Sequence, residues 1–535
     1  MDSGRLSRLR APVRAELAPS RLSRFGAPVL VPIAVAGLAL AGCIDQLAQA
    51  HALFGGDEYD DGVYLGAALR LVNGAAPYRD FTFLHPPGII LLLSPLAALA
   101  RWTGSRDFAG EARVLTALVA SANAGLLAWL LRHRGTPAML IAGGTLAVFP
   151  LAVAADHTVL LEPYLVLFCL VGATAMFAGD ELASRTRLVW AGEALGFAGA
   201  VKIWAIFPLA VALGCCVPQF RRGIRPLLLG AVAGFALVCW PFFLLAPTKF
   251  VRDTIGLQLD RAPSPGGSLS PGARLLNVTG LDGLPALHAT VHGAVILAVV
   301  YIFLVACAYL VPPRPSRLDW FALGSASSTV AAVFLAADFG PHFAYFTATF
   351  LALLLAVSCE RLIRATTDWI AGRRETQIGR GAAQASRLVV VIVLLVLATL
   401  FAEGRLFIRE QRWRVNFGDP GPPIARVIPE GACVVTDEPA FSIIADRFVA
   451  DSSNCPKMVD SFGEWLAADP RHPPPSPGPY DPGLVGAWRS WFSSADYVIL
   501  TSQFRIPWTP ELRSWFASQF KAVSFEGARV YRKRR

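Results

Sequence analysis

Charged residues are few in this chain: they make up 16% of its 535 residues, against about 25% in an ordinary soluble domain. Hydrophobic residues account for 54%, and the mean hydropathy is +0.50. Apolar runs of roughly 20 residues, the length that crosses a hydrocarbon core, recur between Val29 and Leu400. The sequence therefore predicts a protein whose main solvent is a lipid bilayer.

Several patterns that would indicate other classes of protein are missing. Segments of alternating hydrophobicity are rare, so helices rather than a transmembrane barrel are expected to cross the bilayer. The sequence has no Cys-x-x-Cys motif, no His/Cys cluster with zinc spacing and no internal repeat. The formal charge of +10 comes mainly from arginines in short loops, where they orient the helices, so no nucleic-acid partner is expected.

Eleven apolar segments predict a polytopic α-helical bundle with about eleven transmembrane helices. If the basic N-terminus, residues 1–27, is cytoplasmic, the later arginine clusters also fall on the cytoplasmic side, as the positive-inside rule requires. The predicted spans are residues 28–48, 111–131, 137–154, 158–178, 188–200, 203–219, 226–246, 288–310, 318–337, 344–360 and 388–404.

The apolar segment 86–102 is almost long enough to cross the membrane as well. If it crossed, the later arginine clusters would face outward, so we expect it to lie in the outer interface. The transmembrane part, 28–404, then carries a first outer loop at 49–110 with interfacial helices. Lysine is rare while Ala, Gly and Pro are abundant, which suggests a GC-rich genome. We expect a multi-pass protein of the plasma membrane and cell envelope of a bacterium.

The polar tail, residues 405–535, is expected on the extracytoplasmic side. Strand patterns at 431–437 and 496–502, a closing pair of strands and two tryptophan-rich helical stretches predict a small α/β domain. Cys433 and Cys455 lie in this tail, where an oxidising compartment would allow them to form a disulfide.

Four carboxylates fall within five positions soon after the first span: Asp57, Glu58, Asp60 and Asp61. Such clustering at a membrane boundary is costly unless a cation or a reaction requires it, because close like charges disfavour ionisation. The segment 61–71 that follows predicts a short amphipathic helix along the interface, ended by an Asn-Gly pair.

From the acidic cluster onward the chain reads Asp60-Asp61-Gly-Val-Tyr64, then Asn73-Gly74, Pro77-Tyr78 and His85-Pro86-Pro87-Gly88. This order resembles the first outer loop of the C-type glycosyltransferase superfamily, which includes protein O-mannosyltransferases, aminoarabinose transferases and oligosaccharyltransferase catalytic subunits. In that superfamily the first Asp of an acidic pair is the catalytic base. The resemblance therefore implies Asp60 as the base and Asp61 as its neighbour. Asp57-Glu58 is a competing pair, but it lacks the tyrosine three residues on.

The resemblance extends to later loops. Asp156 and Glu162 fall where the superfamily has its second acidic motif. Since the superfamily contains both metal-dependent and metal-independent members, it stays open whether a divalent cation, Mg or Mn, is bound, either by these two residues or by Asp61. Lys202 ends a glycine-rich helix and is implied as a ligand of the lipid phosphate, and His342 lies in a similar late turn.

The chemistry suits these residue types. Transfer of a sugar from a polyprenyl phosphate requires a base near the acceptor hydroxyl and positive charge near the departing phosphate. Asp60 would supply the base, and Lys202, Arg261 and His342 would supply the charge. The sequence thus predicts an inverting hexosyl- or pentosyltransferase that binds membrane lipids and a lipid-linked sugar donor, and that acts on a glycan, lipid or protein hydroxyl.

Other readings remain. A transporter or flippase of lipid-linked saccharides is the alternative function, although transporters place charged groups near the midplane, often in paired repeats. Lys202 can also extend to the headgroups, and Asp156 can be a solvated turn. Arg261 and His342 can be structural, and Asp57 and Glu58 can be a charged helix end.

Overall fold

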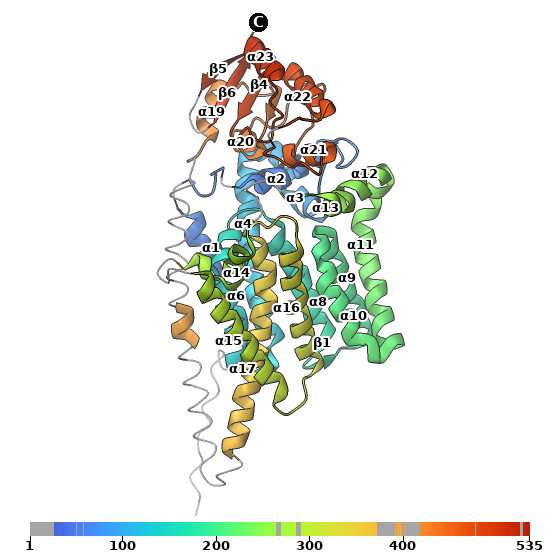
Figure 1. The fold of residues 1–535 in the computed structure, drawn as a ribbon, viewed down its shortest axis with the longest axis vertical. Coiled ribbons are helices and arrows are strands. Elements are labelled where there is room, and N and C mark those ends of the chain that lie inside the picture. The colour runs from blue at the N-terminus through green and yellow to red at the C-terminus, as the bar shows by residue number, and fades with distance from the viewer. Residues whose placement is uncertain are drawn as a thin grey trace, which may run out of the picture.

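The computed structural model describes residues 26–49, 51–56, 58–263, 269–284, 290–371, 391, 393–398, 402, 418–476, 478–524 and 528–534. These residues are mostly helical. Figure 1 shows a helical bundle that carries the C-terminal segment, residues 418–534, on one end. Asp57, the N-terminus up to residue 25 and much of the predicted span 388–404 lie outside the described residues.

Six stretches of the described chain are long and apolar enough to cross a membrane, as in a multi-pass membrane protein. Other bundle helices are shorter, and the number of crossings, about eleven, stays a prediction. The six stretches are Ala27–Leu47 (α1), Ser105–Leu130 (α4), Ile203–Leu245 (containing α10, Ile206–Cys216, and α11, Arg225–Leu245), Val291–Leu310 (α15), Arg317–Leu335 (α16) and Phe343–Thr367 in α17 (Phe343–Ala371). The shorter helices include Leu161–Met176 (α8), Arg185–Val201 (α9) and Pro271–Thr279 (α14).

The predicted span 137–154 forms an interrupted helix. Phe149 has an extended backbone and Pro150 lacks a backbone N–H, so the helix breaks between them. The pieces are Thr136–Met139 (α5), a π-helical turn at Leu140–Gly144, Thr145–Val148 (α6) and Pro150–Ala155 (α7).

Helices α9 and α11 run parallel with their backbones in near contact. Four glycines permit this approach, because a Cβ on any of them would collide with a backbone carbonyl of the other helix: Gly192, Gly196, Gly230 and Gly234. This is the small-xxx-small packing of membrane helices. Between them, α9 ends at Val201, and Lys202 has an extended backbone before the chain turns into α10.

The first-loop helices α2 (Tyr59–Val72) and α3 (Gly88–Thr103) lie between the bundle and the C-terminal segment (Figure 1). As predicted, α2 ends at Asn73, and Gly74 follows with a positive φ of 85°. The position of α2 along a membrane interface stays a prediction. The helix is buried on most sides, because α20 (Pro439–Ile444) covers it so closely that a side chain at Gly62 would collide with Ala440.

The C-terminal segment contains a mixed four-stranded sheet in the order β3-β4-β6-β5. Each strand forms where the sequence predicted one: β3 Val434–Thr436, β4 Tyr497–Leu500, β5 Phe520–Ser524 and β6 Arg529–Lys533. β3 pairs with β4 in parallel, and the remaining pairs are antiparallel. The Cys433–Cys455 disulfide joins the start of β3 to a later loop. The helices of this segment are Gly421–Val427 (α19), α20, Ser461–Ala468 (α21), Pro482–Ser494 (α22) and Pro510–Gln519 (α23).

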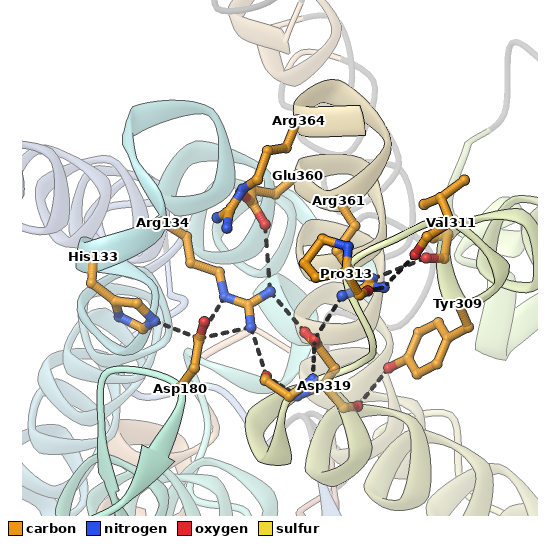
Figure 2. Close-up of polar contacts among 12 residues, drawn as sticks. His133, Arg134, Asp180, Tyr309, Val311, Pro313, Asp319, Glu360, Arg361 and Arg364 are labelled. Atoms are coloured by element: carbon orange, nitrogen blue, oxygen red, sulfur yellow. Dashed lines mark hydrogen bonds and ion pairs between the residues drawn. The ribbon is translucent and has the colours of Figure 1, made fainter. Parts of the chain in front are cut away.

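A buried ionic cluster connects the loops at the other end of the bundle. Figure 2 shows Arg134 between Asp180, Asp319 and Glu360, with 2.7 Å from the guanidinium to each of the two aspartates and 3.4 Å to Glu360. Arg361 also contacts Asp319, at 3.3 Å. The cluster therefore ties the turn after α4 and the hairpin of β1 (Phe177–Ala178) and β2 (Glu181–Leu182) to α16 and α17.

Candidate active site

A cavity of about 1250 Å³ lies between the bundle and the C-terminal segment. Its walls come from the first loop, from α9 to α11, from the region of α13 (Leu257–Asp260), from residues 336–343 and from the C-terminal segment. Five residues selected from the sequence line it: Glu58, Asp60, Lys202, Arg261 and His342.

Asp60 presents its carboxylate to this cavity from the first turn of α2. Its side chain is 39% exposed, and its Oδ2 lies 4.0 Å from Nε2 of His342. Because its carboxylate is accessible from the cavity, Asp60 can accept a proton from a bound hydroxyl group.

Lys202 occupies the break between α9 and α10, where its ammonium is buried. Its Nζ lies 2.5 Å from Oε1 of Glu162 and 3.8 Å from the centre of the Phe343 ring. The carboxylate and the aromatic face together compensate for taking this charge out of water. Lys202 is thereby held as a fixed positive charge at the cavity wall.

Arg261 forms an ion pair with Asp338, and both residues line the cavity. The loop that carries Asp338 is held from behind by Arg274 of α14, whose Nη1 donates to the carbonyl oxygens of Val333 and Ala336 at 2.8 Å each. A positive group is thus placed on the side of the cavity formed by residues 336–343.

The C-terminal segment adds polar groups to the same cavity. Tyr59 Oη donates to Oδ1 of Asp460 at 2.7 Å, and the Arg505 guanidinium lies 3.7 Å from the centre of the Tyr59 ring. Burial, aided by the charge of Asp60, raises the pKa of Asp460 to about 6. Burial, with the charges of Lys202 and Arg261, lowers the pKa of His85, another lining residue, so that it is neutral.

The remaining wall of the cavity is apolar and follows α9, α10 and α11. Its side chains include Ile206, Val232 and Phe235, which are 62%, 59% and 37% exposed. A hydrocarbon chain can therefore pack along this wall while a polar group at its end reaches the charged residues.

Two solved structures of ArnT from Cupriavidus metallidurans are similar to this chain. The one bound to undecaprenyl phosphate has a TM-score of 0.59 at 16% identity, covering 93% of this chain and 97% of that chain. The apo structure has a TM-score of 0.57 at 15% identity, covering 95% and 98%. An oligosaccharyltransferase from Archaeoglobus fulgidus, tethered with an acceptor peptide, has a TM-score of 0.52 at 12% identity, covering 95% and 74%. The chain has the fold of the C-type glycosyltransferases. The sequence matches no family model and no curated protein.

Within this C-type glycosyltransferase fold, Asp61 does not line the cavity. It is 0% exposed and forms an ion pair with Arg113, and its Oδ1 accepts a hydrogen bond from the Val159 backbone N–H at 3.1 Å. Arg113 in turn donates to the carbonyl oxygens of Leu53 and Gly55. Asp61 thus fixes the first loop against the turn before α8, while its neighbour Asp60 faces the cavity.

Asp156 and Glu162 do not join at a metal site in the described chain. Asp156 is buried beside Tyr345, whose hydroxyl also accepts from Asn123, whereas the Glu162 carboxylate already accepts from Lys202. Among the described residues no group of three or more His, Cys, Asp or Glu side chains is placed to hold a metal ion. The predicted divalent cation on Asp156 and Glu162 stays untested.

Tyr59, His85, Asp460 and Arg505 also line the cavity but were not among the residues selected from the sequence. Of these, Tyr59 and His85 could have been selected from the sequence, because both lie within the first-loop motif that begins at the acidic cluster. Asp460 and Arg505 could not, since they reach the site from a segment about 400 residues away along the chain.

Proposed function

We propose that this chain is a membrane glycosyltransferase that moves a sugar from a polyprenyl-phosphate donor to a hydroxyl group of an extracytoplasmic glycan, lipid or protein, with inversion and with Asp60 as the base. One observation carries the proposal. A single cavity combines the accessible Asp60 carboxylate, the positive groups Lys202 and Arg261, and an apolar wall suited to a polyprenyl chain. The likeness in fold to the ArnT structure bound to undecaprenyl phosphate supports it.

The proposed reaction is a single displacement. The acceptor hydroxyl gives its proton to Asp60 as its oxygen forms a bond to the anomeric carbon of the donor sugar. The bond between that carbon and the phosphate oxygen breaks at the same time, and the electron pair leaves with the polyprenyl phosphate. Lys202, Arg261 and His342 stabilise the negative charge on the departing phosphate. Attack opposite to the leaving group inverts the anomeric centre.

The proposed orientation places the cavity and the C-terminal segment outside the plasma membrane, with the N-terminus in the cytoplasm. The hairpin of β1 and β2 lies at the end of the bundle opposite the C-terminal segment (Figure 1), and its Asp180 pairs with Arg134 (Figure 2). Arginines at that end, Arg134 and Arg361 among them, support this orientation. In this orientation 405–535 is an extracytoplasmic domain, and about eleven helices cross the bilayer.

The proposal is tested by reconstituting the full chain in liposomes and supplying a panel of radiolabelled polyprenyl-phosphate sugars with an envelope extract as the source of acceptor. We expect transfer from at least one donor, and we expect Asp60→Asn to reduce it at least a hundredfold, because a general base contributes about 10²–10⁴ in rate. Asp107→Asn, on the exposed first turn of α4, is the matched control and should retain full transfer. Undiminished transfer by Asp60→Asn would exclude Asp60 as the base.

A further inference from the structure

Asp460 is a carboxylate in the cavity that the proposed transfer leaves without a role. Asp460 is 4% exposed, and its side chain reaches the cavity from the start of α21. Its Oδ1 accepts from Tyr59 Oη at 2.7 Å and from the Gly463 backbone N–H at 2.8 Å. Its Oδ2 accepts no hydrogen bond from any residue that the structure describes. One oxygen therefore caps the helix, and the other stays available to a ligand.

The nearby guanidinium of Arg505 does not donate a hydrogen bond to Oδ2 of Asp460 either. Arg505, which is close enough to influence the ionisation of Asp460, directs its Nη1 toward Ser502 at 3.2 Å and Glu438 at 3.9 Å. Its guanidinium stacks on the rings of Tyr59 and Phe504 at 3.7 and 4.3 Å. A donor on a ligand in the cavity can therefore form a hydrogen bond with a carboxylate oxygen that accepts none from the described residues.

Aromatic rings from the C-terminal segment line the same cavity as Asp460. Phe462 and Phe504, both from the C-terminal segment, line the cavity together with Tyr59 and Asp460. A carboxylate oxygen accepts the hydroxyl of a sugar, and the C–H face of a sugar ring packs against an aromatic side chain. The combination suits a polyhydroxylated ring better than a hydrocarbon chain, for which the apolar wall along α9, α10 and α11 is available, or a phosphate, which the carboxylate would repel.

We propose that Asp460, Phe462 and Phe504 form a sugar-binding wall, in which Oδ2 of Asp460 accepts a hydrogen bond from a ring hydroxyl. The inference rests on the proposed function and deepens it, because the C-terminal segment becomes part of substrate recognition. The bound ring belongs either to the donor or to a glycan acceptor, and both present the same chemistry.

The test measures binding to the purified full chain in nanodiscs, so it needs no turnover. The probes are undecaprenyl phosphate, the same lipid bearing one of a panel of hexoses and pentoses, and the methyl glycosides of those sugars. The variants are Asp460→Asn, which keeps Oδ1 but places an N–H donor at Oδ2, and Phe504→Ala, at a residue that is 41% exposed. Glu464→Gln is the matched control, because this carboxylate lies on the same helix and accepts from the Thr82 backbone N–H outside the cavity.

We expect Asp460→Asn to weaken a sugar-bearing probe about tenfold or more, as for loss of a hydrogen bond to a charged group, and Phe504→Ala to weaken it severalfold. Both variants should bind sugar-free undecaprenyl phosphate as the wild type does. The control Glu464→Gln should bind every probe as the wild type does. Loss confined to the glycosylated lipid assigns the ring to the donor, and loss confined to methyl glycosides assigns it to the acceptor.

Two results would overturn the sugar-binding wall. In one, Asp460→Asn and Phe504→Ala bind every sugar-bearing probe as the wild type does. In the other, no sugar improves the binding of the wild type over the sugar-free lipid and no methyl glycoside binds. Either is distinguishable from failure of the proposed function, which shows as absent transfer or as transfer that survives Asp60→Asn.

Discussion

Asp60 and Asp61 are adjacent carboxylates whose removal should have opposite consequences. Asp61 and Arg113 are 0% and 1% exposed, so Asp61→Asn would leave the Arg113 guanidinium buried without its counter-ion. Loss of one partner of a buried pair costs about 3–5 kcal/mol. Asp60 is 39% exposed, and Asp60→Asn should change the free energy of unfolding by no more than about 0.5 kcal/mol.

The assay heats the detergent-solubilised full chain to a series of temperatures. The fraction of protein that stays monodisperse in size-exclusion chromatography gives the midpoint of thermal unfolding. Asp61→Asn should lower the midpoint clearly, and Asp60→Asn should match the wild type while losing transfer. The double variant Asp61→Leu with Arg113→Met removes both charges and should recover part of the lost stability. If Asp61→Asn unfolded at the wild-type temperature, the pair would not be the anchor of the first loop described above.

The two remaining predictions concern the ionic cluster and Asp460. Arg134→Met should lower the free energy of unfolding by about 3–5 kcal/mol, because it removes a cation that pairs with the buried carboxylates of Asp319 and Glu360. Arg364 is half-exposed, so Arg364→Met should lower it by only about 0.5 kcal/mol. Equal midpoints for the two variants in thermal unfolding would contradict this. Since the pKa of Asp460 is raised to about 6, chiefly by burial, its carboxylate protonates as pH falls through that value. Affinity for a sugar-bearing probe should therefore decrease from pH 7.5 to 5 in the wild type and stay level in Asp460→Asn, as measured by titration at each pH. Parallel pH profiles for the two proteins would rule out Asp460 as the titrating group.

Much of the architecture follows from local sequence. Helix α2 and its end at Asn73 were predicted because a helical periodicity meets a residue pair that disfavours helix, and Gly74 does adopt a positive φ. Strands β3 and β4 were predicted from short β-branched runs, and they pair with each other. Such signals are contained in neighbouring residues and need no knowledge of the tertiary contacts.

The acidic motif did not predict that Asp60 faces the cavity while Asp61 is buried in an ion pair with Arg113. Successive residues on a helix point about 100° apart, so one carboxylate reaches the cavity while the next reaches the protein interior. Which of them meets Arg113 depends on how α4 packs, and that contact spans 52 positions of sequence. Asp460 was missed for a related reason, since its role at the site depends on the docking of the C-terminal segment on α2.

The ion pairs around the cavity have a consequence for how the proposed lipid-linked donor arrives. The charged lining residues are the cations Lys202, Arg261 and Arg505 and the carboxylates Glu58, Asp60, Asp338 and Asp460, so the walls carry no excess of positive charge. A phosphate is therefore not drawn from a distance by the field of the cavity. Under the proposed function, recruitment falls instead to the bilayer, which concentrates the hydrocarbon tail of the donor and lets it diffuse in two dimensions to the apolar wall. The salt concentration of the medium should then have little influence on the rate of capture, and the density of the lipid in the membrane should set it.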